Sequence, residues 1–166
     1  MRDLHFTTEL EWSPDGVGTI AGSDFTTQIS VPAEMGGRGV GANPEELLVG
    51  AAASCFTANL IALLRRRGLP VSSVSVSATG TVTGPPGRAR FKSIAVVPTI
   101  LGGDPTRQSE YEIGAVLAHT RCLIANTLSS EVAYSVDAVY VHAEDQLPDN
   151  ASRATSRGTA QIPASA

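Results

Sequence analysis

The residues of this 166-residue chain best suited to redox chemistry are its two cysteines, Cys55 and Cys122. They lie far apart in the sequence, and neither belongs to a Cys-x-x-Cys motif. With only three histidines, the chain is poor material for zinc ligation, and we expect no metal site. A cysteine acts as a nucleophile only as its thiolate, so a reactive Cys55 needs a cation or hydrogen-bond donors nearby. The alternative is that both cysteines are small core residues, which is the usual fate of free cysteine.

Each cysteine has mostly small neighbours at helical spacing. Those of Cys55 are Leu48, Ala51, Ala58, Asn59 and Ala62, and those of Cys122 are Ala115, Ala118, His119, Ala125 and Asn126. Helices that meet through such faces pack closely, which would point both thiols at one interior. A disulfide then requires Cβ atoms within about 4.5 Å of each other.

Three basic side chains are candidates for stabilising a thiolate: Arg38, His119 and Arg121. His119 is most simply a partly exposed or hydrogen-bonded core histidine. Arg121 is adjacent to Cys122 in the sequence and so points about 100° away from it on a helix, so we expect it to be exposed. Arg38 lies in a glycine-rich loop, residues 36–41, whose spacing does not match a phosphate-binding motif.

The helix that must carry Cys55 has the clearest boundaries in the chain. Asn43 suits the N-cap, Pro44 the first helical position, and Glu46 the third position of a capping box. Residues 47–64 are apolar nearly all round, which is typical of a buried helix. Three arginines at 65–67 and the glycine at 68 mark its end, and we interpret these arginines as a solvated helix end.

The remaining patterns predict an α+β fold in the order β-β-β-α-β-β-α-β, with antiparallel sheets and two long helices. Residues 108–128 form the second helix. The predicted strands are residues 4–12, 17–21, 25–31, 71–83, 90–100 and 132–141. Residues 1–143 form one domain, and the polar residues 144–166 are expected to be a disordered tail.

Composition and charge exclude several classes of protein. A hydrophobic content of 42 % supports a core, and a net charge of −4 argues against a nucleic-acid binder. No uninterrupted apolar run approaches the ~20 residues of a membrane span, and the N-terminus does not read as a secretory signal. We therefore expect a cytoplasmic protein that has no membrane partner and whose cysteines are thiols.

Four short segments together carry a resemblance to a known family. Residues 32–37 read PAEMGG, residues 41–48 read GANPEELL and residues 53–56 read ASCF, with Cys122 in a later segment, TRCLIAN. Over residues 4–143 this arrangement resembles the OsmC/Ohr family of osmotically inducible and organic-hydroperoxide-resistance proteins. The NPEELL element ten residues ahead of a cysteine, with a distant second cysteine, is a specific signal.

The resemblance implies a thiol peroxidase that defends against oxidative or osmotic stress and works as an intertwined homodimer. By similarity, Cys55 is the peroxidatic thiolate that attacks an organic hydroperoxide, and Cys122 is the resolving thiol that forms a disulfide with it. A dithiol, in some members carried by a lipoylated protein, reduces that disulfide. The family chemistry requires no cofactor. The alternative is a non-catalytic member of the fold that senses redox state or binds a small ligand.

The resemblance also assigns site residues of opposite charge. Glu45 carries over as the acidic residue, but ten helical residues separate it from Cys55 by about 15 Å. We therefore expect Glu45 to reach the thiol from a partner helix packed antiparallel. Its simpler interpretation is a first-turn acid that complements the helix dipole. The family's arginine in the N-terminal hairpin is missing from residues 12–17, and Arg38 is the nearest substitute.

Overall fold

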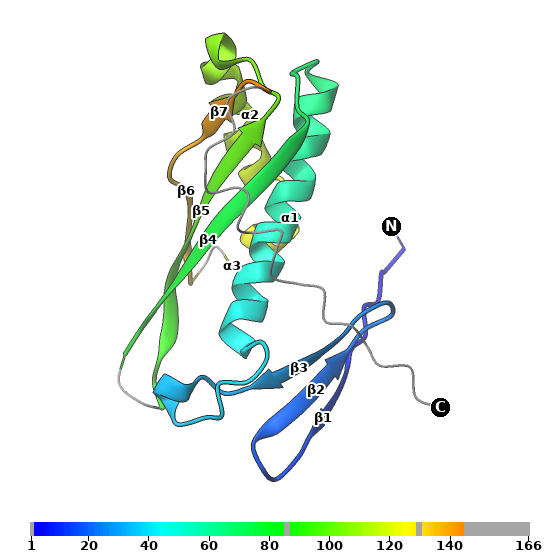
Figure 1. Cartoon of the computed structure of the whole chain (residues 1–166), viewed down its shortest axis with the longest axis vertical. Helices are drawn as coiled ribbons and strands as arrows, with labels where there is room; N and C mark the ends of the chain where they lie inside the picture. Colours follow the sequence, from blue (N-terminus) through cyan, green and yellow to red (C-terminus); the bar gives the residue numbers. More distant parts are fainter. Residues whose placement is uncertain (1, 85–86, 129–130, 145–166) are drawn as a thin grey trace.

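The computed structural model describes residues 2–84, 87–128 and 131–144. The chain forms two parts, a small N-terminal sheet and a larger body in which helices cover one face of a second sheet (Figure 1). The N-terminal sheet lies beside the first end of the long helix and projects away from the body. The predicted α+β class is confirmed.

The N-terminal sheet is an antiparallel meander of β1 (Glu9–Trp12), β2 (Val17–Ala21) and β3 (Thr26–Ser30). The pairing places Leu10 opposite Ile20 and Trp12 opposite Gly18, so large apolar side chains gather on one face. Leu10 and Trp12 are nonetheless 57 % and 45 % exposed. Three short strands cannot bury such a face by themselves, so this sheet depends on something else to cover it.

The loop between the two parts is shaped by its glycines. It contains a single 3-10 turn, η1 (Ala33–Met35), and then pairs with β3 through a bridge between Ala42 and Ile29. Gly41 has a φ of +71°, and a Cβ there would lie 2.2 Å from the carbonyl oxygen of Gln28. Only glycine permits this close approach of the two backbones.

The helix α1 (Pro44–Arg66) begins with the predicted capping box. The Asn43 side chain accepts a hydrogen bond from the Glu46 N–H at 2.7 Å, and the Glu46 carboxylate accepts one from the Asn43 N–H at 3.2 Å. The helix ends in Arg65 and Arg66, as the sequence predicts. One face of α1 is buried against β4 and α2, while the opposite face, which includes Ala51 and Ala58, is exposed.

The second sheet is built on a long hairpin of β4 (Ser73–Thr83) and β5 (Arg90–Leu101). Two short strands, β6 (Ala133–Val136) and β7 (Tyr140–His142), add to the other side of β5, and both run parallel to it. The prediction of one antiparallel strand at 132–141 is wrong in two ways. The helices after β5 carry the chain back to the starting end of that strand, which makes the pairing parallel. The strand is also divided, because pairing with β5 stops after Val136 and Asp137 and resumes at Tyr140.

The predicted second helix, residues 108–128, is also divided. A 3-10 turn, η2 (Pro105–Arg107), leads into α2 (Gln108–Thr120), and α3 (Leu123–Leu128) follows after a break. At the break the Asn126 amide donates to the Thr120 carbonyl at 3.1 Å, and the Ala125 N–H donates to the Cys122 sulfur at 3.4 Å. The Cys122 side chain thus caps the start of α3. The sequence has no glycine or proline here that would signal a helix boundary.

The core of the body lies between the helices and the second sheet. Its fully buried large side chains come from α1, β5 and α2, namely Phe56, Leu60, Leu64, Val96, Ile100 and Tyr111. The Tyr111 hydroxyl donates to the Pro70 carbonyl and accepts from the Asp104 N–H, so its polar end is satisfied. A smaller cluster of Ala52, Ile94 and Val132, with Ile124 and Tyr134 packed against it, extends the core toward the cysteines.

Other differences from the sequence prediction concern the chain ends and hydropathy. The first strand begins at Glu9 and not at residue 4, and all but the first residue of the predicted tail, 145–166, lies outside the described residues. The sequence has no uninterrupted apolar run as long as a membrane span, yet by length and composition α1 could cross a membrane, with 28 % of its apolar window buried. This is weak evidence, because the central helix of a water-soluble fold passes the same test.

Candidate functional site

Cys55 lies in the middle of α1 and is half-buried. Partial burial acts to raise the pKa of its thiol, but four hydrogen-bond donors outweigh burial and lower the pKa below its usual range. In decreasing order these are the Ile124 N–H, the Cys122 thiol, the Leu123 N–H and the Asn59 amide. The Asn59 amide nitrogen lies 3.8 Å from the Cys55 sulfur, one helical turn along α1. Cys55 is therefore the more readily ionised cysteine.

Cys122 lies at the junction between α2 and α3 and is fully buried. Burial is the largest cause that raises the pKa of this thiol, and the neighbouring Cys55 raises it further, against the Ala125 N–H that lowers it. The Cys122 sulfur also lies 3.9 Å from the Ala52 carbonyl oxygen of α1. Cys122 therefore keeps its proton and can donate it, either to Cys55 or to that carbonyl.

The two sulfurs form a pair with divided roles. They come from different elements, yet each lies close enough to shift the pKa of the other, in opposite directions. A pair of titratable groups whose environments push their pKa values apart is typical of acid and base assignments in active sites. Here the half-buried Cys55 ionises more readily, and the fully buried Cys122 keeps its proton beside it.

The donors that stabilise the Cys55 thiolate are neutral. The sequence predicts Asn59 on the face of Cys55, and its named candidates for stabilising the thiolate are basic side chains. In the structure, Leu123 and Ile124 instead act through their backbone N–H groups at the start of α3. Free N–H groups in the first turn of a helix are aimed outward and favour negative charge. These donors could not be read from side-chain types, because any residue at positions 123 and 124 except proline supplies them.

Tyr134 of β6 is a further neighbour that the sequence does not single out. Its hydroxyl donates to the Ala52 carbonyl at 3.3 Å, and its ring stacks on His119 with centroids 5.0 Å apart. Burial raises the pKa of Tyr134 well above its usual range, and the charges of Cys122 and Cys55 act in the same direction. His119 is thus a half-exposed stacking partner of Tyr134, and Arg121 is exposed, as predicted.

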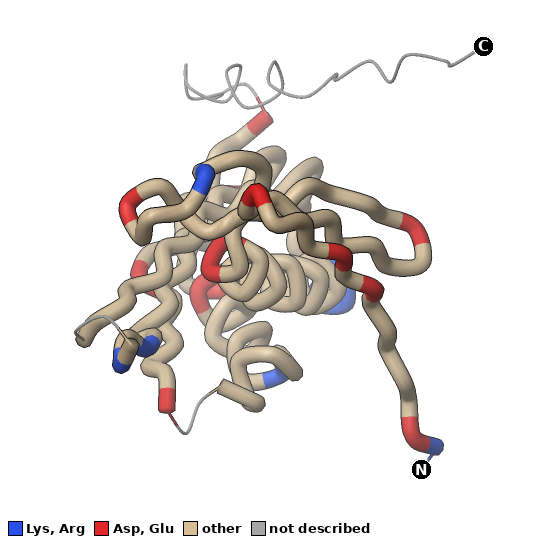
Figure 2. The backbone as a smooth tube through the Cα atoms, turned by 90° about the horizontal axis from the view of Figure 1, so that it is seen from below, with Lys and Arg blue, Asp and Glu red and all other residues tan. Residues whose placement is uncertain are grey.

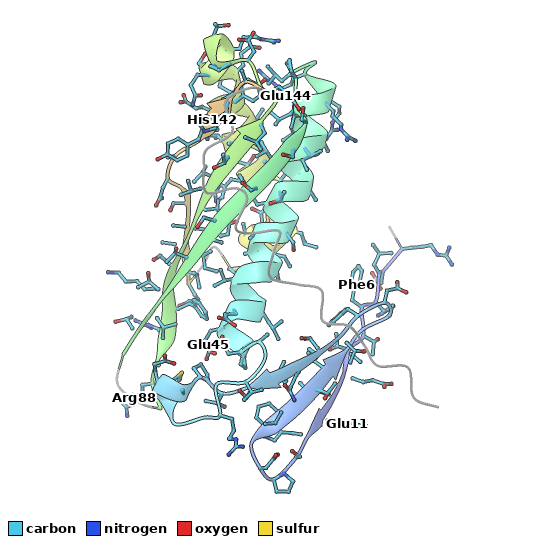
Figure 3. The ribbon with its side chains drawn as sticks, viewed as in Figure 1. Phe6, Glu11, Glu45, Arg88, His142 and Glu144 are labelled. Carbon is cyan, nitrogen blue, oxygen red and sulfur yellow. The ribbon has the colours of Figure 1, made fainter. Side chains whose placement is uncertain are left out.

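Glu45 lies in the first turn of α1, at the end of the helix that faces the N-terminal sheet (Figure 3). Because α1 is one uninterrupted helix, Glu45 and Cys55 of the same chain stand about 15 Å apart. The Glu45 carboxylate lines an open groove of about 570 Å³ between α1 and the β4–β5 hairpin. One of its oxygens, Oε2, is buried and has no hydrogen-bond partner among the described residues. A buried carboxylate oxygen of this kind calls for a donor.

Arg38 lies beside the β1–β2 turn of the N-terminal sheet. Its Cγ is 3.3 Å from the position that a Cβ at Gly16 would take. The Asp15 carboxylate of that turn has a pKa below its usual range, chiefly because Ser13 and the Val17 N–H donate to it, with a smaller contribution from Arg38. Within one chain the structure does not bring Arg38 to the cysteines. It does bring it to the hairpin where the family arginine was expected. Figure 2 shows that the basic residues stand in small separate groups.

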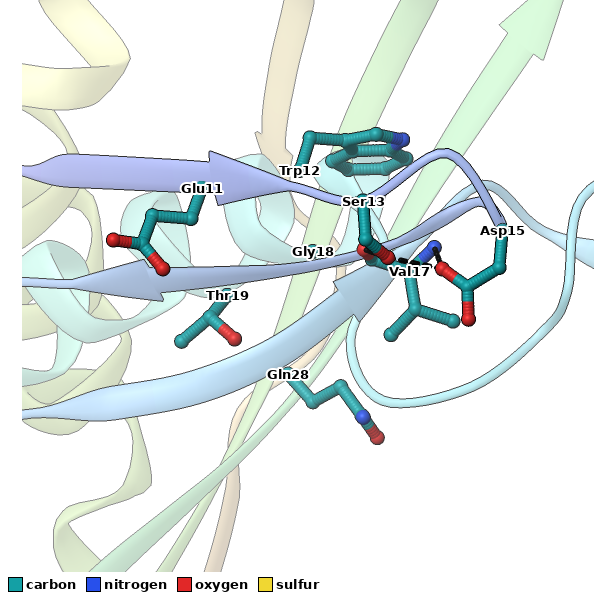
Figure 4. Close-up of a pocket in the computed structure, with 8 residues that line it drawn as sticks. All are labelled: Glu11, Trp12, Ser13, Asp15, Val17, Gly18, Thr19 and Gln28. Atoms are coloured by element: carbon teal, nitrogen blue, oxygen red, sulfur yellow. Dashed lines mark hydrogen bonds between the residues drawn. The ribbon is translucent and has the colours of Figure 1, made fainter.

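The other features of the surface do not point to a cofactor. Within residues 2–84, 87–128 and 131–144, no group of three or more His, Cys, Asp or Glu side chains is placed to hold a metal ion. A groove of about 430 Å³ lies on the N-terminal sheet, over Glu11, Thr19 and Gln28 (Figure 4). It contains neither cysteine, and its residues belong to the sheet and turn and not to the body that carries the thiols.

The family of the chain follows from its similarity to known proteins. The family model described as "OsmC-like protein" matches residues 36–137. An uncharacterized protein of Bacillus subtilis (strain 168), YmaD, is 32 % identical over 143 residues, covering 83 % of this chain and 95 % of that protein. The chain therefore belongs to the OsmC-like family, which agrees with the resemblance read from the sequence.

Solved structures share the fold at lower identity. An organic hydroperoxide resistance protein OsmC from Legionella pneumophila is 24 % identical, with a TM-score of 0.67 over 84 % of this chain and all of that chain. A putative organic hydroperoxide resistance protein from Vibrio cholerae, with captopril bound in one of its active sites, is 23 % identical, with a TM-score of 0.64 over 82 % of this chain and 93 % of that chain. At this level of identity the likeness establishes the fold.

Proposed function

We propose that this protein is a cysteine-based peroxidase that reduces organic hydroperoxides, with Cys55 as the peroxidatic residue and Cys122 as the resolving residue. The observation that carries the proposal is the divided pair of thiols, in which the half-exposed sulfur has a lowered pKa and the buried sulfur a raised one. Membership of a family that includes organic hydroperoxide resistance proteins supports the choice of substrate.

In the first step the Cys55 thiolate attacks the distal oxygen of the hydroperoxide. The O–O bond breaks, an S–O bond forms, and the substrate leaves as an alkoxide that takes up one proton to become an alcohol. Cys55 is oxidised to a sulfenic acid while the peroxide is reduced by two electrons. The donors around Cys55, above all the Ile124 N–H, favour the anionic sulfur from which this step begins.

In the second step the Cys122 sulfur attacks the sulfenic sulfur of Cys55. An S–S bond forms, the S–O bond breaks, and the hydroxyl leaves as water with the proton of Cys122. A dithiol then reduces the disulfide by exchange, which returns both cysteines to thiols and leaves the dithiol oxidised. The reductant is a small dithiol or a protein that carries one, such as a lipoylated protein. Both cysteines are free thiols in the structure, which is the state that this cycle starts from.

The proposal includes a homodimer. Its support is the apolar surface that one chain leaves uncovered, on the N-terminal sheet at Leu10 and on the outer side of the helices at Val116 and Leu123. Large apolar side chains left exposed in this number are expected to be covered by a partner. Antiparallel packing of two α1 helices would bring the partner's Glu45 toward Cys55, and Arg38 would then be the cation that pairs with this carboxylate. The proposed location is the cytoplasm, where both thiols stay reduced.

The decisive experiment is mass spectrometry of the reduced protein after one equivalent of an organic hydroperoxide such as cumene hydroperoxide. We expect the loss of two hydrogens, mapped to a peptide pair joined through Cys55 and Cys122, and one equivalent of alcohol. The Cys122→Ser variant should instead stop at the sulfenic acid on Cys55. An unmodified pair, or oxidation that begins at Cys122, would contradict the proposal.

A non-catalytic redox sensor remains the second candidate function. The observation in its favour is that the groups lowering the Cys55 pKa are all neutral, which stabilises a thiolate less than a cation does. Steady-state turnover separates the two functions. A peroxidase consumes many equivalents of hydroperoxide with dithiothreitol as reductant, whereas a sensor is oxidised once and reduced slowly.

A further inference from the structure

We propose that Tyr134 is a positioning residue for the thiol pair, because its hydroxyl occupies the Ala52 carbonyl and thereby directs the Cys122 S–H to the Cys55 sulfur. The inference deepens the proposed function and rests on it for its biological meaning. The hydrogen-bond arrangement itself can be tested without any peroxide.

The argument starts from one acceptor that two donors can reach. The Ala52 carbonyl lies 3.3 Å from the Tyr134 hydroxyl oxygen and 3.9 Å from the Cys122 sulfur. A carbonyl oxygen has two lone pairs, and in the helix α1 the Phe56 N–H uses one of those of Ala52. An O–H is a stronger donor than an S–H and stands closer here, so Tyr134 takes the remaining lone pair in preference to Cys122. Ala52 precedes Cys55 by three residues on α1, which places the contested carbonyl one helical turn from the peroxidatic sulfur.

The Cys122 thiol has few places to send its proton. Its sulfur accepts a hydrogen bond from the Ala125 N–H at 3.4 Å. This bond uses a lone pair of the sulfur and leaves the S–H free to donate. The S–H therefore chooses between the Ala52 carbonyl and the Cys55 sulfur. A donor directed at Cys55 stabilises the thiolate, whereas the same donor turned to Ala52 leaves Cys55 with one hydrogen bond fewer.

Tyr134 is held in place for this role by the sheet. It pairs with Ile94 in the β5–β6 register, and Ile94 is fully buried, so both side chains point toward the helices. Its ring is fixed from the other side by His119. Among the described residues, the titratable group that faces the sulfurs is Tyr134 of β6, and His119 of α2 lies behind it. Arg121, at the junction before Cys122, is exposed.

The test is the pH dependence of Cys55 alkylation by iodoacetamide in the reduced full-length protein, read by mass spectrometry. We expect Tyr134→Phe, which keeps the ring, to raise the midpoint and to slow alkylation at neutral pH by about threefold to tenfold, the worth of one hydrogen bond. The rate on the alkaline plateau should not change. Tyr140→Phe, which removes an exposed hydroxyl on β7, is the matched control.

A double-mutant cycle with Cys122→Ala separates this role from a structural one. Cys122→Ala alone should raise the Cys55 midpoint, and adding Tyr134→Phe should then change nothing, because the effect of Tyr134 passes through the Cys122 proton. If Tyr134→Phe folds poorly, an unchanged midpoint in Cys122→Ala still overturns the inference, because Tyr134 acts only through the Cys122 proton.

The outcomes are distinguishable. An unchanged midpoint in Tyr134→Phe or in Cys122→Ala overturns the inference, as does a change of equal size at every pH, which reports altered access to Cys55. A raised midpoint in a protein that shows no peroxide turnover upholds the hydrogen-bond role of Tyr134 and contradicts the proposed peroxidase instead.

Discussion

The middle of α1 and its first turn differ in whether one chain supplies hydrogen-bond donors to the functional side chain there. Around Cys55, neighbours from the start of α3 and from α1 itself already supply donors to the sulfur. Around Glu45, ten residues earlier, a buried carboxylate oxygen has no partner among the described residues and borders an open groove. One chain therefore supplies the donors to the thiol by itself, whereas in our proposal the charged part of the site requires a second copy of the chain.

Removal of the peroxidatic sulfur should have the largest effect. We expect Cys55→Ser to lower peroxide turnover by about a thousandfold or more, because the hydroxyl does not ionise near neutral pH and no other group can attack. The readout is hydroperoxide consumption with dithiothreitol in excess. Cys122→Ser is the companion variant, which should still consume one equivalent rapidly. Equal loss of that first equivalent in both variants would contradict the division of roles.

The second prediction tests whether Glu45 serves catalysis. Glu45→Gln keeps the shape of the side chain but removes the charge, and we expect turnover to fall by about a hundredfold if the carboxylate orients a cation at the thiolate. Glu46→Gln is the matched control one residue along. Glu46 takes part in the capping box, so its change affects helix stability and not the site. Equal activity of the two variants would leave Glu45 with its helix-dipole role alone.

The third prediction tests the uncovered N-terminal sheet. If a second copy covers it, Leu10→Ser should dissociate the dimer and destabilise it by about 2 kcal/mol, well above the ±0.5 kcal/mol usual for an exposed position. Analytical ultracentrifugation and thermal unfolding report the two effects. Leu64→Ala is the reference, because it cuts a cavity in the core of the body, should cost about 2–5 kcal/mol, and leaves the association state unchanged. An active monomer would contradict the dimer.

The smallest effect concerns pH and stability. The folded-state pKa of Cys55 lies below its unfolded value, so its thiolate contributes stability that is present above the unfolded pKa and is lost as the pH falls through the folded one. Cys122 has a raised pKa, so its contribution is present below the unfolded pKa and is lost as the pH rises through the folded one. As the pH rises from about 6 to about 9, the free energy of unfolding of Cys55→Ala should therefore fall relative to that of the wild type. Over the same rise in pH, that of Cys122→Ala should increase relative to the wild type. Denaturant unfolding of the reduced proteins measures both trends, and parallel curves would contradict the assignment.

Much of the fold could be predicted because its signals are local. The boundaries of α1 follow from Asn43, Pro44 and Glu46, and those of the β4–β5 hairpin follow from alternation and a proline-glycine turn. The break at Cys122 could not be predicted, because the cap is a cysteine sulfur and the sequence there contains no glycine or proline. The parallel pairing of β6 and β7 depends on where the helices return the chain, which no short window of sequence records.

The sequence by itself determined the residues that matter for the proposed chemistry: two cysteines in helical surroundings of small residues, an acid in the first turn of a capped helix, and an arginine in a glycine loop. The resemblance implied that Cys55 is the thiolate, and only the tertiary structure supplied the physical ground for choosing Cys55 over Cys122. That choice depends on burial and on the direction of backbone N–H groups from α3, neither of which is a property of residue type. It also placed Tyr134 over the Ala52 carbonyl, a contact set by strand register across residues far apart in the chain.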